Sequence, residues 1–306
     1  MRLYPLLGAA LAVALMLACA EDDTADISLW SMFRGPMPGG VSLRDVDASG
    51  PDDVWAVGAQ GKILHYDGVR WSFYQGSVTD LDLNAVAITT GSSGWAVGAD
   101  GVVVRYHNGQ WYNTVHLTGY DLYGVAFDGG GTGFAVGDHG VIFRYDGQSW
   151  RDVSLAGVTA DLRDVATAEG GTAWAVGDAG TVLYYDGGRW RKVAVPTPER
   201  LHGVALGGGG VYAVGDDGVI LYNGGASWRV VPAPATASLQ GLDAANDAAF
   251  ACGNDGTMLG VKDGSWGRIG LELPPVNLNG VVLCNGGEGW AVGDQGVILR
   301  YRRVGG

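Results

Sequence analysis

The sequence predicts an all-β fold, a seven-bladed β-propeller of four-stranded blades, and three observations carry this prediction. A motif of an aromatic or apolar residue, Ala-Val-Gly, two turn residues and a second Gly has its first copy at Trp55–Gly61. The motif returns seven times at intervals of 38 to 40 residues, a period typical of propellers and solenoids. The strands are rich in Val, Tyr and Trp, and Gly accounts for 54 of 306 residues, which disfavours helices. The two ends of the repeat region are complementary, which favours a closed ring over an open solenoid.

Each repeat is predicted to contain four strands in a fixed order. The first is an apolar Leu-x-x-Val segment, such as Leu43 to Val46, and the Trp-Ala-Val-Gly strand follows a break. The Gly-x-x-Gly link is expected to be a tight hairpin in which glycine supplies the positive φ. A third strand ends at an Asp-Gly turn such as Asp67-Gly68, and a Trp opens the fourth strand. This Trp follows the second turn glycine by ten residues in all six copies that have both, giving Trp71, Trp111, Trp150, Trp190, Trp228 and Trp266.

The seventh copy ends at Tyr301-Arg302-Arg303 without its Asp-Gly turn and its Trp. The missing strand is present near the N-terminus, because Trp30-Ser31-Met32-Phe33 resembles Trp71-Ser72-Phe73-Tyr74. We therefore expect the N-terminal strand to complete the last blade, so that residues 27–303 form the propeller and no long sheet edge is exposed.

The first 19 residues are predicted to be an export signal and not part of the ring. Arg2 precedes an apolar run from Leu6 to Ala18 that is too short for a stable transmembrane helix. Its end, Leu17-Ala18-Cys19, resembles a bacterial lipobox, in which Cys19 would carry the lipid, although Met16 stands where Leu is more usual. The alternative is cleavage after Ala18-Cys19-Ala20 and simple secretion. Residues 20–26 form a short acidic tether, so a lipid at Cys19 is the only membrane attachment expected, in the outer membrane or periplasm.

Charge and cysteine content narrow the partners and the chemistry. With 19 basic and 32 acidic residues, the chain lacks the basic face that nucleic acid binding requires. Cys252 precedes the glycine turn of one repeat, whereas Cys284 lies at the far end of a first strand in the next. The two are expected near opposite faces, beyond disulfide reach, as small thiols of the core.

The stretch Trp174–Leu183 followed by Asp186–Trp190 resembles the repeat of photosystem II assembly-factor propellers and of the wider bacterial group of BNR-like propellers. The resemblance extends from about Trp30 to Tyr301 and implies the propeller architecture. It implies no particular activity, because one fold hosts many functions. The Asp-box of sialidases is a more distant relation, and in those enzymes it is a structural turn away from the active site.

The enzymatic and metal-binding interpretations have less support in the sequence. Phe33-Arg34-Gly35-Pro36 resembles a sialidase motif whose Arg binds a substrate carboxylate, but repeats this short leave no room for catalytic loops. Asp45–Gly50 matches half of an EF-hand loop, yet Ala56 stands at its twelfth position and Asp45 is in a predicted strand. The histidines, at 65, 107, 116, 139 and 202, have no ligand spacing. We therefore expect no enzyme, no metal and no cofactor, with a sialidase-like glycoside hydrolase as the third function considered.

The residue directly after the first-strand Leu is polar or amphipathic in every repeat, and this strand is innermost in a propeller. These residues are expected to ring one mouth of the central channel, as a binding surface or as a solvated collar: Arg44, Asn84, Tyr123, Arg163, His202, Gln240 and Asn279. The same face should carry the acidic turn residues Asp100, Asp138, Asp178, Asp216, Asp217, Asp255 and Asp294, which are also ordinary turn formers.

The function predicted on this basis is a monomeric, non-enzymatic protein of the cell envelope that binds a protein or peptide partner at the channel mouth. The alternative is a glycan-binding lectin that uses Tyr74, Tyr112 and Tyr120 as stacking platforms. The same aromatics are equally suited to covering blade edges.

Overall fold

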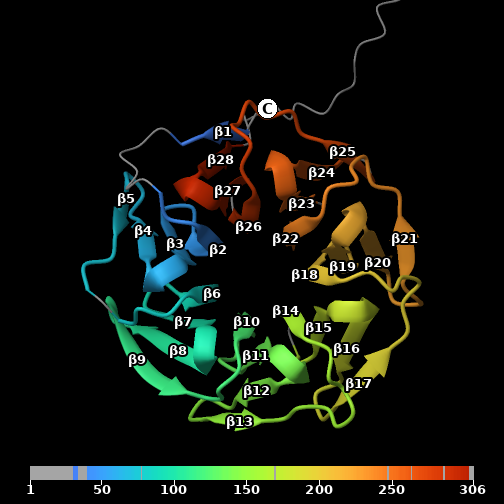
Figure 1. The fold of residues 1–306 in the computed structure, drawn as a ribbon, viewed down its shortest axis with the longest axis horizontal. Coiled ribbons are helices and arrows are strands. Elements are labelled where there is room, and N and C mark those ends of the chain that lie inside the picture. The colour runs from blue at the N-terminus through green and yellow to red at the C-terminus, as the bar shows by residue number, and fades with distance from the viewer. Residues whose placement is uncertain are drawn as a thin grey trace, which may run out of the picture.

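Seven four-stranded antiparallel sheets surround a central axis in the computed structural model (Figure 1). The structure describes residues 30–33, 40–76, 78–168, 170–246, 248–262, 264–284 and 287–302. The predicted fold class is confirmed. In six of the seven sheets the strands follow one another from the axis outward in chain order, so each of these repeats folds as one local sheet. The leader through residue 29 and the C-terminal boundary of the propeller lie outside the described residues, so the predicted domain limits stay predictions.

The strand bounds repeat with small variations around the ring. Blade one contains β2–β5, at Leu43–Gly50, Asp53–Gly58, Ile63–Tyr66 and Trp71–Phe73, and blade two contains β6–β9, at Leu83–Thr90, Ser93–Gly98, Val102–His107 and Gln110–His116. Blade three contains β10–β13, at Leu122–Phe127, Gly133–Gly137, Ile142–Tyr145 and Trp150–Asp152, and blade four contains β14–β17, at Leu162–Thr167, Ala173–Gly177, Thr181–Tyr185 and Trp190–Val193. Blade five contains β18–β21, at Leu201–Gly207, Gly210–Gly215, Ile220–Asn223 and Arg229–Val231. Blade six contains β22–β25, at Leu239–Ala245, Ala248–Gly253, Met258–Lys262 and Ser265–Arg268. Blade seven contains β26–β28, at Leu278–Cys284, Glu288–Gly293 and Ile298–Arg302, together with β1 at Trp30–Met32.

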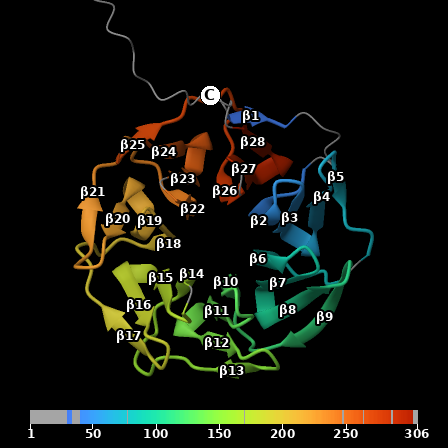
Figure 2. The same cartoon turned by 180° about the vertical axis from the view of Figure 1, so that it is seen from behind.

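The N-terminal strand closes the ring as predicted. Strand β1 pairs antiparallel with β28, with Trp30 opposite Tyr301 and Met32 opposite Leu299. The view from behind shows β1 at the outer edge of the blade formed by β26, β27 and β28 (Figure 2). The first and last described strands therefore complete one sheet.

The two glycines of the repeated turn are not both required for a positive φ, as had been expected. The first glycine is extended, as in Gly177 at φ −175°, and the turn that follows is a short 3-10 segment such as Asp178–Gly180. A Cβ on Gly177 would lie 2.0 Å from the carbonyl oxygen of Asp161, so this position requires glycine because the backbones meet there. Only the second glycine has positive φ, 59° at Gly180, and the residue before it is also left-handed, as in Ala179 at 53°.

Aromatic contacts join each blade to the one before it. In all seven blades the Trp at the outer strand packs edge-on against an aromatic ring of the preceding blade's second strand, at centroid distances of 5.2 to 5.8 Å. The pairs are Trp30–Phe250, Trp71–Trp290, Trp111–Trp55, Trp150–Trp95, Trp190–Phe134, Trp228–Trp174 and Trp266–Tyr212. The indole Nε1 atoms of these seven outer-strand residues are buried without a conventional acceptor. Edge-on packing places the positive indole edge against the π face of the neighbour, which accounts for the recurring geometry.

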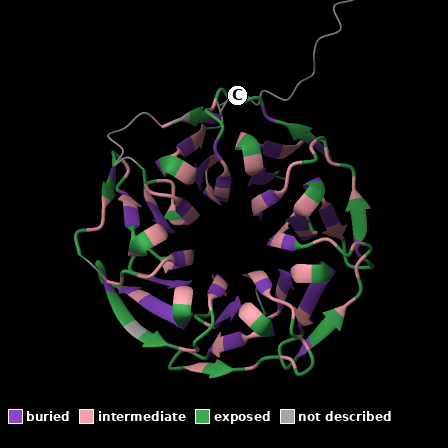
Figure 3. Cartoon of the chain, in the orientation of Figure 1, coloured by how far each residue is buried: buried purple, intermediate pink, exposed green. Residues whose placement is uncertain are grey.

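The middle strands of the blades are mostly buried, while most exposed residues lie on the outer strands and turns (Figure 3). The first-strand Leu is fully buried in every blade, and apolar residues of neighbouring blades form shared clusters. Cys252 and Cys284 are buried free thiols in separate clusters, as expected. Over the described ranges, no helix is long and apolar enough to cross a membrane.

Candidate binding site at the channel mouth

A local irregularity of the innermost strand positions the candidate site. In every blade the pairing of the first two strands shifts between the buried Leu and the residue two positions on, as between Leu43 and Asp45. Such a bulge re-aims the extra residue away from the ladder. That residue is the predicted ring position in each blade, such as Arg44 after Leu43.

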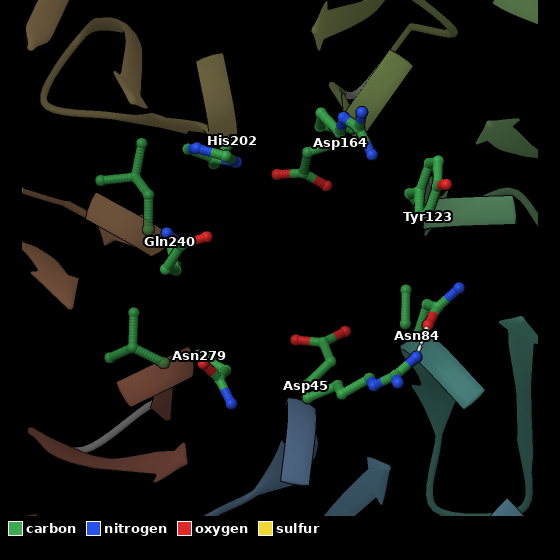
Figure 4. A pocket seen from close by; sticks show the side chains of 14 residues that line it. Asp45, Asn84, Tyr123, Asp164, His202, Gln240 and Asn279 are labelled. Atoms are coloured by element: carbon green, nitrogen blue, oxygen red, sulfur yellow. Dashed lines mark hydrogen bonds between the residues drawn. The ribbon is translucent and has the colours of Figure 1, made fainter. Parts of the chain in front are cut away.

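The structure brings all seven ring residues together around one cavity of about 280 Å³ (Figure 4). Arg44, Asn84, Tyr123, Arg163, His202, Gln240 and Asn279 each contribute from a different blade. A second cavity of about 310 Å³ continues along the axis, and Asp45 and Asp164 line both cavities. The mouth is therefore the entrance to a deeper channel.

Five of the ring residues are bonded to the first residue of their own blade's glycine turn. Arg163 donates from Nε to Asp178 Oδ1 at 2.9 Å, and His202 Nε2 lies 2.9 Å from Asp216 Oδ1. The other pairs are Tyr123 with Asp138, Gln240 with Asn254, and Asn279 with Asp294. The expectation that ring and turns share a face is confirmed, and the turns hold the ring side chains in place.

Blades one and two lack this pair because their turns begin with Ala59 and Ala99. Arg44 instead reaches sideways into the next blade, where it donates to Asn84 and to Asp82 Oδ2, the latter at 2.5 Å. Asn84 in turn donates from Nδ2 to the carbonyl of Leu122 at 2.8 Å. Here the ring residues connect successive blades.

Arg163 is the most firmly held charge of the mouth. It binds both oxygens of Asp178, donates to Asp161 Oδ2 at 3.0 Å, and lies 4.5 Å above the ring of Tyr123. The hydrogen bond from Arg163 holds the pKa of Asp178 below its ordinary value. Burial, and then the hydrogen bond to Asp138, raises the pKa of Tyr123 to about 12, so the phenol stays neutral.

The acidic turn residues divide into two groups. Asp138, Asp178, Asp216 and Asp294 begin their turns and bond inward to the ring. Asp100, Asp217 and Asp255 occupy the left-handed middle position, with φ of 52° to 56°, and are exposed. Only the second group is presented outward.

Four further carboxylates face the channel, and the repeat pattern alone did not reveal them as a group. Asp45, Asp47, Asp164 and Asp243 lie on the innermost strands β2, β14 and β22 and line the two cavities. Asp45 and Asp47 belong to the partial EF-hand match, but they lie within β2 and their oxygens accept backbone N–H groups. Alignment of the seven inner strands could have found them, since other blades have Gly, Ala or Val at these places.

The remaining candidate residues do not converge. Tyr74 is partly buried at a blade seam and accepts a hydrogen bond from the Trp111 backbone, so it is no free stacking platform. Tyr112 is exposed on β9, while Tyr120 is exposed beside His139. Phe33 packs against Trp290, whereas Arg34 of the sialidase-like motif and Cys19 lie outside the described residues. In the described ranges no group of three or more His, Cys, Asp or Glu side chains is arranged to hold a metal ion.

No protein-family model matches the sequence, and no curated protein is similar to it. Solved structures share the fold at low identity. Ycf48 bound to a D1 peptide has a TM-score of 0.73 and 19% identity, over 90% of this chain and 97% of that one. Virginiamycin B lyase from Staphylococcus aureus has a TM-score of 0.77 and 14% identity, over 90% and 100% of the two chains. The WD40 repeats of RRP9 have a TM-score of 0.72 and 10% identity, over 90% and 97%. The likeness to photosystem II assembly-factor propellers is thus confirmed for the fold, and the neighbours include both a lyase and a propeller bound to a peptide.

Proposed function

We propose that the protein is a non-enzymatic interaction scaffold that binds a peptide or protein segment at the channel mouth. The observation that carries the proposal is that one polar side chain from each of the seven blades lines a single open cavity. The solved Ycf48 structure with a bound D1 peptide supports it, because a propeller of similar fold accepts a peptide. The binding surface would be the seven ring residues together with the outward turn aspartates.

Charge indicates the chemistry of the partner. The guanidinium groups of Arg44 and Arg163 are paired with Asp82, and with Asp161 and Asp178, so the mouth holds no unpaired arginine among the described ring residues. The outward carboxylates Asp100, Asp217 and Asp255 leave this face acidic, as is the chain, with a net charge of −13. A segment carrying Lys or Arg complements such a face, and salt should weaken its binding.

The partner site is tested by photo-crosslinking in native membranes. A photo-reactive phenylalanine analogue replaces Gln240 at the mouth, and in a matched control it replaces Val69, which is 80% exposed on an outer turn. We expect a discrete adduct from the mouth position alone, reduced by added salt, with a basic segment at the crosslink. Equal adducts from both positions, or none from the mouth, would overturn the proposal.

A variant set separates the mouth from general surface charge. Replacing Asp100, Asp217 and Asp255 together by Asn should abolish capture of a basic segment, because these outward carboxylates supply the charge that complements it. The control replaces Asp67, Asp146 and Asp186 by Asn, because these three are exposed in the turns between the third and fourth strands. Capture that persists in the first set refutes the site. Capture of a glycan that free sugar displaces would favour the lectin alternative.

The cellular location of the protein is part of the same proposal. The leader with Cys19 favours an exported, lipid-anchored protein of the bacterial envelope. The acidic tether of residues 20–26 spans at most roughly 24 Å when fully extended. The propeller would then bind its partner close to the membrane surface.

A further inference from the structure

The four channel carboxylates make a repeated contact between blades. Each carboxylate accepts one backbone N–H from its own strand and one from the innermost strand of the next blade. Asp45 accepts from Val46 and from Val86, both at 2.8 Å. Asp164 accepts from Val165 and Val204, Asp243 from Ala244 and Leu283, and Asp47 from Ala48 and Ile88, at 2.6 to 2.8 Å.

The propeller does not require these charges for its architecture. The corresponding positions of the other blades hold small or apolar residues, such as Gly124 and Gly280 in place of Asp45, and Ala126 and Val282 in place of Asp47. Those blades have the same four strands and the same bulge. The aspartates are thus an addition to three inner strands of an otherwise uniform ring.

No cation offsets the four carboxylates within the described part of the chain. The strands packed against β2, β14 and β22 carry these titratable or charged groups: Asp53, Tyr123, His202, Tyr212, Cys252, Cys284 and Glu288. The glycine turns packed against the same three strands add Asp138, His139, Asp216, Asp217 and Asp294, and His139 is exposed there beside Tyr120. His202 pairs with Asp216, Asp53 with His65, and Glu288 with Arg300. On the same strands as the carboxylates, Arg44 and Arg163 are paired with rim carboxylates. The four negative charges therefore face one another along the channel.

We propose that Asp45, Asp47, Asp164 and Asp243 form a proton-binding set that makes the ring more stable at mildly acidic than at alkaline pH. Each carboxyl belongs to a partly buried residue and is shielded from bulk water in a channel shared with like charges, and protonation removes both costs. This property is independent of the proposed binding function.

The direction of the pH effect follows from the titration of these groups. Burial raises the pKa of Asp45 to about 6 and those of Asp47 and Asp164 to about 7, and it also raises the pKa of Asp243. In the unfolded chain an Asp titrates near 4, so the folded protein binds more protons between about pH 4 and 7. This stabilisation is fully present below the unfolded pKa and is lost as the pH rises through the folded values.

Exposed aspartates with the same number of backbone hydrogen bonds provide the matched control. Asp67, Asp146 and Asp186 each accept two N–H groups in the turn between the third and fourth strands. Those hydrogen bonds lower the pKa of each of the three carboxyls. The opposite direction in the channel therefore arises from burial and not from the hydrogen bonds.

The test is the melting temperature of the full chain at pH 5 and pH 8. Asn resembles the protonated acid in shape and donor pattern, so the reference variant is Asp45→Asn, Asp47→Asn, Asp164→Asn and Asp243→Asn combined. We expect the natural protein to melt higher at pH 5 by roughly 5 °C, and the variant to lose this difference while melting no lower at pH 8. The control variant, with Asp67, Asp146 and Asp186 changed to Asn, should retain the difference.

The proposal is overturned if the natural protein does not melt at a higher temperature at pH 5 than at pH 8. It is also overturned if the quadruple variant keeps the full difference in melting temperature between the two pH values. If the quadruple variant does not fold, carboxyl NMR titration of the natural protein decides. At least two of the four aspartates with midpoints above pH 5 support the proposal, and fewer than two such midpoints refute it.

Discussion

Trp30 packs edge-on against Phe250, with ring centroids 5.4 Å apart and ring planes inclined by 75°. Every other outer-strand Trp makes the same contact with the blade before it, so Trp30 serves blade seven as Trp71 serves blade one. The N-terminal strand thus contributes both a ladder partner for β28 and the side chain that seals blade seven to blade six.

The closure predicts a large loss of stability when the first strand is damaged. Trp30→Ala removes a buried indole and should lower the free energy of unfolding by about 3–5 kcal/mol, measured by denaturant titration. Removing residues 27–33 should leave the edge of β28 unpaired and cause aggregation, seen by size-exclusion chromatography. Trp30→Phe, which keeps an aromatic edge, is the milder control. A truncated protein that stays monomeric and melts unchanged would disprove the closure argument.

The first turn glycine predicts a second sharp effect. Gly177→Ala places a Cβ 2.0 Å from the Asp161 carbonyl oxygen and 2.8 Å from the Leu162 Cα, both backbone atoms that cannot move aside cheaply. We expect a loss of roughly 3 kcal/mol in thermal or denaturant unfolding. Gly267→Ala, on an outer strand with open space around the new methyl group, should change stability by no more than about 0.5 kcal/mol. Equal effects of the two substitutions would contradict the contact.

The two propeller thiols should be unreactive in the folded protein. Burial raises the pKa values of Cys252 and Cys284 to about 12, so almost no thiolate exists at pH 8. Ellman's reagent should label neither thiol in the native protein at pH 8 and both in guanidinium, in a Cys19→Ser background. Rapid native labelling, or an intact mass lower than that of the reduced protein by two hydrogen atoms, would show that the packing or the redox state differs.

The leader makes a prediction that depends on one residue. Cys19→Ser should move the protein from the membrane fraction to the soluble fraction or block its processing, because the lipid is attached there. Immunoblots of fractionated cells report the location, and intact mass reports the lipid. If fractionation is unchanged and the natural mature chain begins at Glu21 without a lipid, the protein is secreted by ordinary cleavage.

The sequence predicted the ring because its information is periodic. The repeated Leu marks the innermost strand of each blade, the repeated Trp marks the outermost strand, and the complementary ends predict how the ring closes. All three features appear in the structure. The placement of the ring residues beside the glycine turns followed from their fixed positions within each repeat. Such features can be predicted because they depend only on strands that are neighbours in the sequence.

The features that escaped prediction depend on contacts between chain segments. The bulge after Leu43 appears only in the register between β2 and β3, and the need for Gly58 comes from the Ser42 carbonyl oxygen, which would lie 2.2 Å from a Cβ at that position. The pairing of Arg44 with Asp82 rather than with its own turn reflects the alanine at position 59. The channel carboxylates become a group only when residues from blades one, four and six meet on the axis.

The clasp between β1 and β28 also has a kinetic consequence. Every other strand pair among the described residues joins neighbours along the chain, so blades can form one after another, whereas the clasp must bring together the two ends of the propeller. Such distant contacts carry the entropy cost of closing a long loop and form late. Strand β1 is therefore the first propeller strand to be synthesised and the last to find its partner. Because β1 has only three residues, the edge of β28 that stays unpaired until the ring closes is short.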